Sequence, residues 1–255
     1  MQIGFIGTGH ITKSVIFGIL GSKLKVNKII ISKRNHKISS TLKNKSKKIT
    51  VLNDNQKIID QSDWVFLSVT PEVGHKILPI LKFKKNQTII SFISTIKMKE
   101  LKKYTKLKSK IVRAIPLPPI SIRKGPVPIY PPNKNVKKFF DHLGTTVEIK
   151  NENLSLNFWS TSSMMAPFYE LLRTLSSWLN QKGINKLDAQ KYITSLFIAL
   201  SEDAKINSKN DLKLLVKNSQ TSKGLNEQAV NELIKSGFYK SLNKTANSIL
   251  KRLKK

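Results

Sequence analysis

The first twenty residues predict a strand, a glycine turn and a helix in immediate succession. The apolar run 3–6 leads into Gly7-Thr8-Gly9-His10-Ile11-Thr12, and a helix-compatible apolar stretch follows at 14–20. Gly7 would let the chain turn sharply off the strand, and Gly9 would remove a Cβ where the backbone approaches a pyrophosphate. The helix would offer unpaired N–H groups and its positive dipole end to the phosphates. This order is typical of a dinucleotide-binding βαβ unit, whose expected cofactor contacts are Gly7, Thr8, Gly9, His10 and Ile11.

The rest of the chain falls into two kinds of pattern. Up to about residue 150 strand and helix patterns alternate, which predicts a mostly parallel sheet with crossover helices. The proline-rich stretch 116–132 is expected to be a loop with at most one edge strand, at 127–130. Beyond residue 150 the periodicity is helical. The expected fold class is therefore α/β: a Rossmann-type NAD(P)-binding domain over 1–150 and an all-α domain over 151–255. Strands are expected at 3–6, 28–32, 49–52, 63–69, 88–93, 110–114 and 145–149, and the C-terminal helices at 167–183, 187–204, 226–236 and 238–253.

Composition limits the partners. The C-terminal helices carry more apolar stripes than a monomeric bundle of this length can bury, which predicts a homodimer or higher homo-oligomer through these helices. No apolar run approaches the roughly 20 residues that span a bilayer. The chain has no cysteine, no metal-ligand spacing among its four histidines and no basic segment before the first strand. We therefore expect a cytoplasmic protein with no membrane partner and no metal.

The formal charge of +31 comes from 41 Lys against only 5 Arg. Nucleic-acid binders concentrate their charge and use Arg for bidentate contacts, whereas these lysines are spread over nearly every segment. We expect solvated lysine-rich surfaces, a field that attracts anionic cofactor and substrate, and no specific nucleic-acid partner. A nucleic-acid-associated protein stays an alternative, which would require binding that persists at physiological salt.

The end of the second strand indicates which cofactor the site prefers. NAD-selective sites place an Asp or Glu there to hold the ribose 2′-OH. This chain has Ser32, Lys33 and Arg34 at that place and no acid. A carboxylate would repel a 2′-phosphate, whereas a hydroxyl and two cations would attract it. The prediction is NADP(H) rather than NAD(H).

The order of motifs resembles the pyrroline-5-carboxylate reductase family over nearly the whole chain. The opening residues 3–9 are close to the family's start, residues 62–71 resemble its strand ending in Ala-Val-Lys-Pro, and residues 113–119 resemble its Arg-x-Met-Pro-Asn-Thr-Pro. The resemblance implies that Asn55, Val69 and Thr70 contact the cofactor and that Ser94 lies near the nicotinamide. It also implies that the helical end is a dimerisation domain.

The departures from the family fall where the substrate would bind. Leu117 replaces an Asn, and the pair Met164-Met165 stands where Gly and Ser are typical. The family's Ser-Pro-Gly-Gly-Thr-Thr turn, which holds the substrate carboxylate, is here Thr-Ser-Lys-Gly-Leu-Asn at 221–226. Of the family's residues in this turn, Gly224 alone survives.

Four residues of this turn are nevertheless the candidate substrate site. The resemblance implies that Gly224, Leu225 and Asn226 hold a carboxylate and that Lys223 adds charge. Asn226, in the place of the family's hydroxyl, is the candidate catalytic donor to the substrate nitrogen. The pattern fits equally a helix N-cap at Asn226 with Glu227 in the first turn.

These features predict an NADPH-dependent oxidoreductase that reduces a small anionic cyclic imine, 1-pyrroline-5-carboxylate or a related C=N compound. The substrate is expected above Ser94 and Pro116. A cyclic imine is protonated or nearly so, and therefore needs no strong general acid from the protein. One alternative is a reductase relative that retains NADP(H) but has lost turnover. Another is a reductase that acts on a carbonyl.

Overall fold

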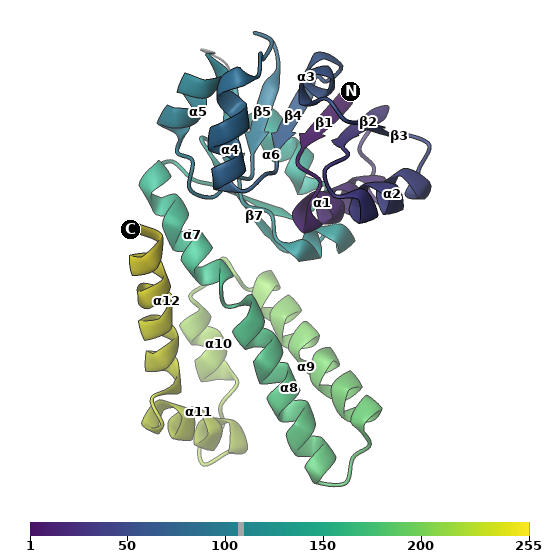
Figure 1. The fold of residues 1–255 in the computed structure, drawn as a ribbon. Helices are drawn as coiled ribbons and strands as arrows, with labels where there is room; N and C mark the ends of the chain where they lie inside the picture. Colours follow the sequence, from purple (N-terminus) through teal and green to yellow (C-terminus); the bar gives the residue numbers. More distant parts are fainter. Residues whose placement is uncertain (107–109, 255) are drawn as a thin grey trace. The chain divides into compact units, whose positions relative to one another are not determined.

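The computed structural model describes residues 1–106 and 110–254, and its chain divides into two compact units, residues 1–155 and 156–255 (Figure 1). The first unit holds a sheet with helices packed against it, and the second is built from helices. The predicted fold class is confirmed. Within the described ranges, no helix is both long and apolar enough to cross a membrane.

An eight-stranded sheet in the order β3-β2-β1-β4-β5-β6-β7-β8 forms the first unit. Neighbouring strands are parallel except β6 and β7. Because the order reverses at β1, which lies between β2 and β4, the carboxyl ends of these three strands open a crevice of the kind that binds dinucleotides. The strands are β1 (Gln2–Ile6), β2 (Lys28–Ser32), β3 (Ile49–Leu52), β4 (Trp64–Leu67), β5 (Thr88–Ser91), β6 (Ile111–Ala114), β7 (Pro126–Tyr130) and β8 (Thr145–Glu148).

Helices cover both faces of this sheet (Figure 1). The alternation of side chains along each strand divides the core into two apolar clusters, so that Phe5 faces one cluster and Ile6 the other. Phe5 stacks on Phe66 of β4 with ring centroids 4.5 Å apart. The helical segments are α1 (His10–Leu20), α2 (His36–Lys45), α3 (Asn55–Asp60), α4 (Pro71–Ile77), η1 (Leu78–Ile80), α5 (Met98–Thr105), η2 (Pro118–Ile122), α6 (Lys134–Asp141) and η3 (Glu152–Leu154).

One strand departs from the sequence prediction. The strand expected at an edge, β7, lies inside the sheet between β6 and β8. Its pairing with β6 is confined to two positions, Arg113 with Tyr130 and Ala114 with Ile129. Pro128 cannot donate a hydrogen bond, but its carbonyl accepts one from the amide of Ile115 at 3.0 Å. An interior position is therefore compatible with this proline.

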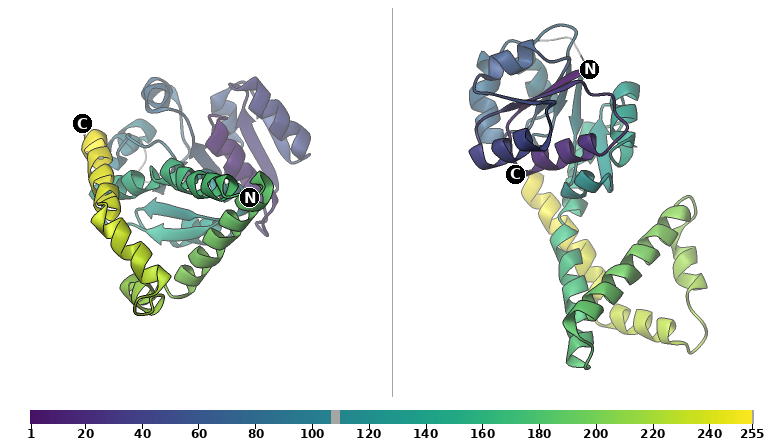
Figure 2. Two further views of the ribbon diagram at one scale, coloured as in Figure 1. Left: turned by 90° about the horizontal axis from the view of Figure 1, so that it is seen from below. Right: turned by 90° about the vertical axis from the view of Figure 1, so that its right-hand side faces the viewer.

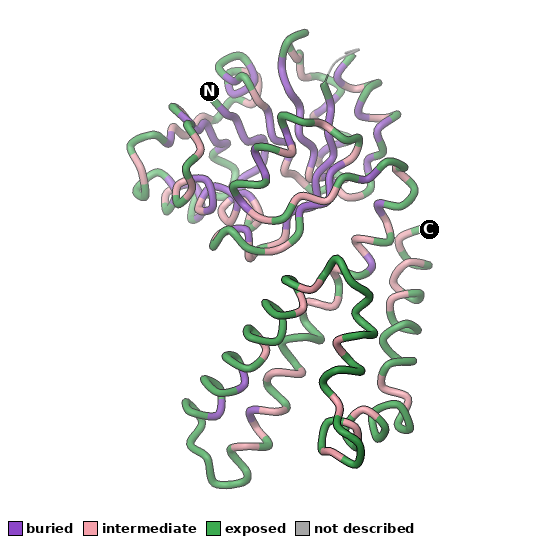
Figure 3. The backbone as a smooth tube through the Cα atoms, turned by 180° about the vertical axis from the view of Figure 1, so that it is seen from behind, coloured by how far each residue is buried: buried purple, intermediate pink, exposed green. Residues whose placement is uncertain are grey.

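The second unit is a set of helices with a very small core. Among its described residues, Ala189 and Ile193 are the only buried apolar side chains, and most of the chain trace is exposed (Figure 3). The helices α7 and α12 lie side by side (Figure 2), joined by a hydrogen bond from the Ser160 hydroxyl to the Ala246 carbonyl. The bounds are α7 (Ser155–Ser162), α8 (Met165–Gln181), α9 (Lys186–Ile206), α10 (Leu212–Asn218), α11 (Leu225–Lys235) and α12 (Phe238–Lys254).

Candidate functional site

The turn between β1 and α1 requires glycine at its first position. Gly7 has φ +98°, and a Cβ built on it would lie 2.2 Å from the carbonyl oxygen of Ser68 at the end of β4. The hydroxyl of Thr12 lies 2.8 Å from both the Gly7 carbonyl oxygen and the Ser68 hydroxyl oxygen. These contacts hold the turn against the neighbouring strand end.

Gly9 has a different role, because nothing in the protein fills the space beside it. It is the N-cap residue of α1, with an extended backbone at φ −102°, and a Cβ built on it would meet no atom within 4 Å. His10 and Ile11 form the first turn of that helix, where amide groups have no partner within the helix. The open space next to Gly9 therefore fits a phosphate bound at a helix N-terminus.

The end of β2 is fastened to the same turn. The Thr8 hydroxyl donates to the Ser32 carbonyl at 2.6 Å, and the Ser32 hydroxyl accepts from the Gly7 amide at 3.1 Å. Both side chains are buried. The Ser32 hydroxyl is therefore engaged inside the protein, so that attraction of a 2′-phosphate would fall mainly to Lys33 and Arg34.

Two adjoining openings lie along the carboxyl ends of the strands, with volumes of about 550 and 460 Å³. They share the turn glycine Gly7, the cation Arg34 and Val69 after β4. Neither lining includes a carboxylate in the part of the chain that the structure describes. Nine of the twelve predicted cofactor residues line these openings: Gly7, Thr8, Gly9, Ser32, Lys33, Arg34, Asn55, Val69 and Thr70.

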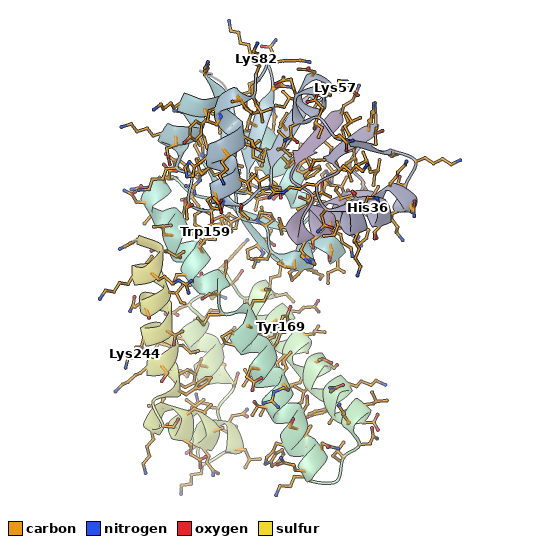
Figure 4. The ribbon with its side chains drawn as sticks, viewed as in Figure 1. His36, Lys57, Lys82, Trp159, Tyr169 and Lys244 are labelled. Atoms are coloured by element: carbon orange, nitrogen blue, oxygen red, sulfur yellow. The ribbon has the colours of Figure 1, made fainter. Side chains whose placement is uncertain are left out.

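The structure adds lining residues that the sequence pattern did not single out. His36, expected to be a solvent or loop residue, is the first residue of α2 and lines both openings (Figure 4). It also borders a third hollow of about 410 Å³ that includes Lys33 and Lys43. Its position shortly after the end of β2, at the start of the next helix, is the sequence feature that could have predicted this placement. The other additions are Ile6, Asn35, Asn53, Ser68, Val73 and Ile77.

Ser94 lies just beyond β5, in the turn that leads to α5. Its carbonyl oxygen accepts a hydrogen bond from Arg113 Nη2 at 2.6 Å. Arg113 is a buried residue of β6. Burial lowers the pKa of this guanidinium below its usual value, and the neighbouring Glu152 carboxylate opposes the shift. The backbone carbonyl of Ser94 is thus fixed by a hydrogen bond from a charged side chain.

The predicted substrate turn belongs to the second unit and joins α10 to α11. Lys223 adopts a left-handed backbone with φ +60°, and its amide donates to Glu227 Oε2 at 2.6 Å. A Cβ on Gly224 would lie 2.1 Å from the Thr221 hydroxyl oxygen, which explains the glycine. The Glu227 side chain folds back on the turn and brings a carboxylate close to the start of α11.

The interpretation of Asn226 as a helix N-cap is wrong. Gly224 is the N-cap residue of α11, so Leu225 begins the helix and Asn226 lies in its first turn. The Asn226 side-chain nitrogen donates instead to the Ser219 carbonyl at 2.8 Å, across the turn. One of its two N–H bonds is committed to that contact, which leaves the second available to a ligand.

Comparisons with known proteins match both units. A family described as NADP oxidoreductase, coenzyme F420-dependent, matches residues 2–95, and pyrroline-5-carboxylate reductase dimerisation matches residues 156–255. Pyrroline-5-carboxylate reductase of Arabidopsis thaliana is 25% identical over 123 residues, which make up 48% of this chain and 44% of that protein. The match thus spans less than half of that relative.

Two solved structures share the fold over their whole length. The 1-pyrroline-5-carboxylate reductase from Streptococcus pyogenes has a TM-score of 0.82 at 22% identity, covering 100% of this chain and 98% of that chain. The Plasmodium falciparum pyrroline carboxylate reductase with NADP bound has a TM-score of 0.81 at 17% identity, covering 100% and 97%. At these identities the likeness shows the fold alone.

A dinucleotide-binding sheet with a glycine turn, followed along the chain by a helical dimerisation unit, defines a class of two-domain oxidoreductases. Within that class, this chain is similar to the pyrroline-5-carboxylate reductases, because their dimerisation family matches its second unit and the two solved structures share its fold.

Proposed function

We propose that this protein is an NADPH-dependent reductase of a small anionic cyclic imine, such as 1-pyrroline-5-carboxylate, which it would convert to proline. The observation that carries the proposal is the cleft at the Gly7–Gly9 turn, lined by Lys33 and Arg34 and by no described carboxylate. The matches to an NADP oxidoreductase family at 2–95 and to the pyrroline-5-carboxylate reductase dimerisation family at 156–255 support the reaction class.

The residues present fit a pyridine nucleotide. The open space beside Gly9 would accept the pyrophosphate, and the first amides of α1 would bind its oxygens. Lys33 and Arg34 at the end of β2 would attract a 2′-phosphate, which NADPH carries and NADH lacks. Asn55 and Val69 line the same cleft, where the nucleoside would lie.

When bound, the cofactor supplies a hydride, and the protein is left with binding, orientation and charge. In a neutral imine, the carbon of the C=N bond would receive this hydride and the nitrogen, whose lone pair can accept a hydrogen bond, would receive a proton from solvent water, so that the C=N bond would become a CH–NH bond. Ser94, fixed by Arg113, would orient the nicotinamide. Lys223 and the amides that begin α11 would bind the substrate carboxylate, and the free N–H of Asn226 would donate to the ring nitrogen.

The direct test measures NADPH oxidation by the full chain with 1-pyrroline-5-carboxylate and a panel of other cyclic imines, and measures NADPH and NADH binding by calorimetry. We expect turnover with at least one imine and tighter binding of NADPH than of NADH. Binding of neither nucleotide by folded protein would overturn the proposal. Binding without turnover on any imine would overturn the reaction but leave the cofactor site.

A second candidate, favoured by the altered turn, is a relative that binds NADP(H) but acts on another substrate or on none. Leu225 is an exposed apolar side chain next to Asn226, which stands at the place of the family's hydroxyl. Glu227 already occupies the Lys223 amide with a carboxylate, and it would compete with or repel a second one. Turnover of a neutral imine or a carbonyl compound, but not of 1-pyrroline-5-carboxylate, would support this candidate.

We also propose that the second unit forms a homodimer. Its helices leave large apolar side chains exposed, and two of them, Tyr169 and Trp178, are 54% and 55% exposed on α8. Exposed apolar surface of this extent is costly in water and marks an interaction site. A second copy would cover it, in agreement with the dimerisation family matched at 156–255.

A further inference from the structure

Arg113 and Glu152 join three separate segments of the first unit through one carboxylate oxygen. Glu152 Oε1 accepts from Arg113 Nη1 at 2.5 Å and from the backbone amide of Met98 at 2.7 Å. A second guanidinium nitrogen of Arg113, Nη2, donates to the Ser94 carbonyl at 2.6 Å. Strand β6, the turn 92–98 and η3 are thus tied together at one point.

These contacts of Arg113 and Glu152, called the tie below, lie at the carboxyl ends of the strands, where a dinucleotide would bind. In the register, Arg113 of β6 faces Ser91, the last residue of β5, and the turn 92–98 continues directly from that strand end. The tie also supplies a hydrogen-bond acceptor at the N-terminus of α5. Lys97, the N-cap residue of that helix, makes no side-chain capping bond, and the Met98 amide is satisfied by Glu152 from a distant part of the chain. Both ends of the turn are therefore fixed by the same ion pair.

Core stability does not require an ion pair at this place. The Arg113 side chain is 5% exposed, and apolar residues of similar size often stabilise a core as well as a buried ion pair does. A guanidinium does provide geometry that an apolar side chain cannot. Its rigid planar fork fixes the direction of two hydrogen bonds at once.

We propose that Arg113 and Glu152 are positioning residues that hold the turn 92–98, and through it the nicotinamide, at the angle required for hydride transfer. The inference rests on the proposed function, since Ser94 would lie at the nicotinamide. The adenosine end of the cleft, lined by Arg34 and Asn55, shares no residue with the tie. Loss of the tie therefore affects hydride transfer and not nucleotide affinity.

The test compares Glu152→Gln with a matched control, Asp141→Asn, which removes one carboxylate from the exposed ion pair between Lys137 and Asp141. We expect Glu152→Gln to lower kcat about 10- to 100-fold, as a misplaced reacting group does, with the Kd of NADPH within about threefold of wild type. The fluorescence of bound NADPH and the kinetic isotope effect with 4-deuterated NADPH should both change. Hydrogen exchange at the Met98 amide, measured without cofactor, should accelerate.

A second variant covers the case in which Glu152→Gln does not fold. Arg113→Lys retains the charge but has no fork, so it cannot hold Ser94 and Glu152 in the same way. It should show the same loss of kcat with unchanged NADPH affinity, whereas Asp141→Asn should match wild type throughout.

The results separate this inference from the proposed function. Wild-type-like exchange, bound-NADPH fluorescence and kcat in the variants would overturn the positioning role. An equal loss of NADPH affinity and kcat would also overturn it, since that indicates a general structural role. If the wild type binds NADPH but reduces no imine, the proposed function fails. In that case altered fluorescence and exchange would still support the positioning role, and unaltered values would reject it.

Discussion

Gly7 and Ser68 approach so closely that a single added carbon on the glycine would lie 2.2 Å from the serine's carbonyl oxygen. The nearby Gly9 shows the opposite, because its missing Cβ would face open space. The two glycines of one turn are therefore required for different reasons. The fold requires Gly7, whereas no described atom of the protein excludes a side chain at Gly9, which agrees with the proposed phosphate site.

This difference gives the first prediction. Gly9→Ala should keep the free energy of unfolding within about 1 kcal/mol of wild type, because the new methyl group meets no protein atom. It should weaken NADPH binding by about tenfold or more, because the methyl group fills the place of a phosphate. Calorimetry with NADPH and a denaturant titration would measure the two quantities.

Gly7→Ala is the matched comparison. It places an L-residue at φ +98° against the Ser68 carbonyl, and should lower the free energy of unfolding by about 2 kcal/mol or more. If Gly9→Ala bound NADPH as wild type does, the space beside Gly9 would not be a phosphate site.

The second prediction concerns the choice of nucleotide. Arg34→Ser should weaken NADPH binding about 10- to 100-fold, because a charge-assisted contact with the 2′-phosphate is lost. Binding of NADH, which has no such phosphate, should change by less than about threefold. Competition binding with both nucleotides at fixed salt measures the ratio.

The control for Arg34→Ser removes a cation that lines neither opening. Lys82 precedes β5, at the amino-terminal end of that strand, and lies far from His36 in Figure 4, so Lys82→Ser should leave both affinities unchanged. Equal losses of NADPH and NADH affinity in Arg34→Ser would contradict a 2′-phosphate role. Equal losses in both variants would indicate general electrostatic attraction by a chain of charge +31.

The third prediction tests the apolar surface of the second unit. Ile198 is 59% exposed on α9, and Ile198→Glu would place a charge in the proposed dimer interface, where its burial costs several kcal/mol. Sedimentation velocity should show a dimer for wild type and a monomer for this variant. Lys138→Glu adds the same carboxylate at an exposed position of α6 in the first unit, outside the proposed interface, and should remain dimeric. A wild-type monomer would reject the interface.

Much of the fold was predictable because its signals are local. The strands of the first half were read from buried apolar runs, and the turn at Gly7 from the glycine spacing. The position of β7 was not predicted, since Pro126 and Pro128 suggest an edge strand. The structure places β7 between β6 and β8, where the Pro128 carbonyl accepts a hydrogen bond. The short helix α10 was also missed, because seven residues carry little periodicity.

In the candidate site, too, residues marked by a local pattern were predicted and residues brought together by distant contacts were not. Lys33 and Arg34 follow directly from their place after β2, and the structure brings them to the cleft. His36 was missed because an isolated histidine belongs to no recognised motif. Its position four residues after the end of β2 is the feature that places it at the cleft. The contacts of Arg113 and Asn226 join positions distant in sequence or across a turn, and no pattern within one segment records them.

The last prediction separates two roles for Asn226. Its side chain donates to the Ser219 carbonyl, which orders the turn, and its second N–H is the proposed donor to the substrate nitrogen. Asn226→Thr retains a short donor at the place of the family's hydroxyl but cannot reproduce the same reach to Ser219. Asn226→Ala removes both functions.

If donation to the substrate matters, Asn226→Ala should lower kcat with 1-pyrroline-5-carboxylate by about 10- to 100-fold, as expected for the loss of one hydrogen bond to a group that gains charge in the transition state. Asn226→Thr should then stay within about threefold of wild type. If the bond to Ser219 matters instead, both variants should lose kcat equally and both should raise the hydrogen exchange of residues 219–226. Because the proposed NADPH site lies in the first unit, NADPH affinity should be unchanged in either variant. A loss of that affinity would contradict the assignment of the two roles to separate units.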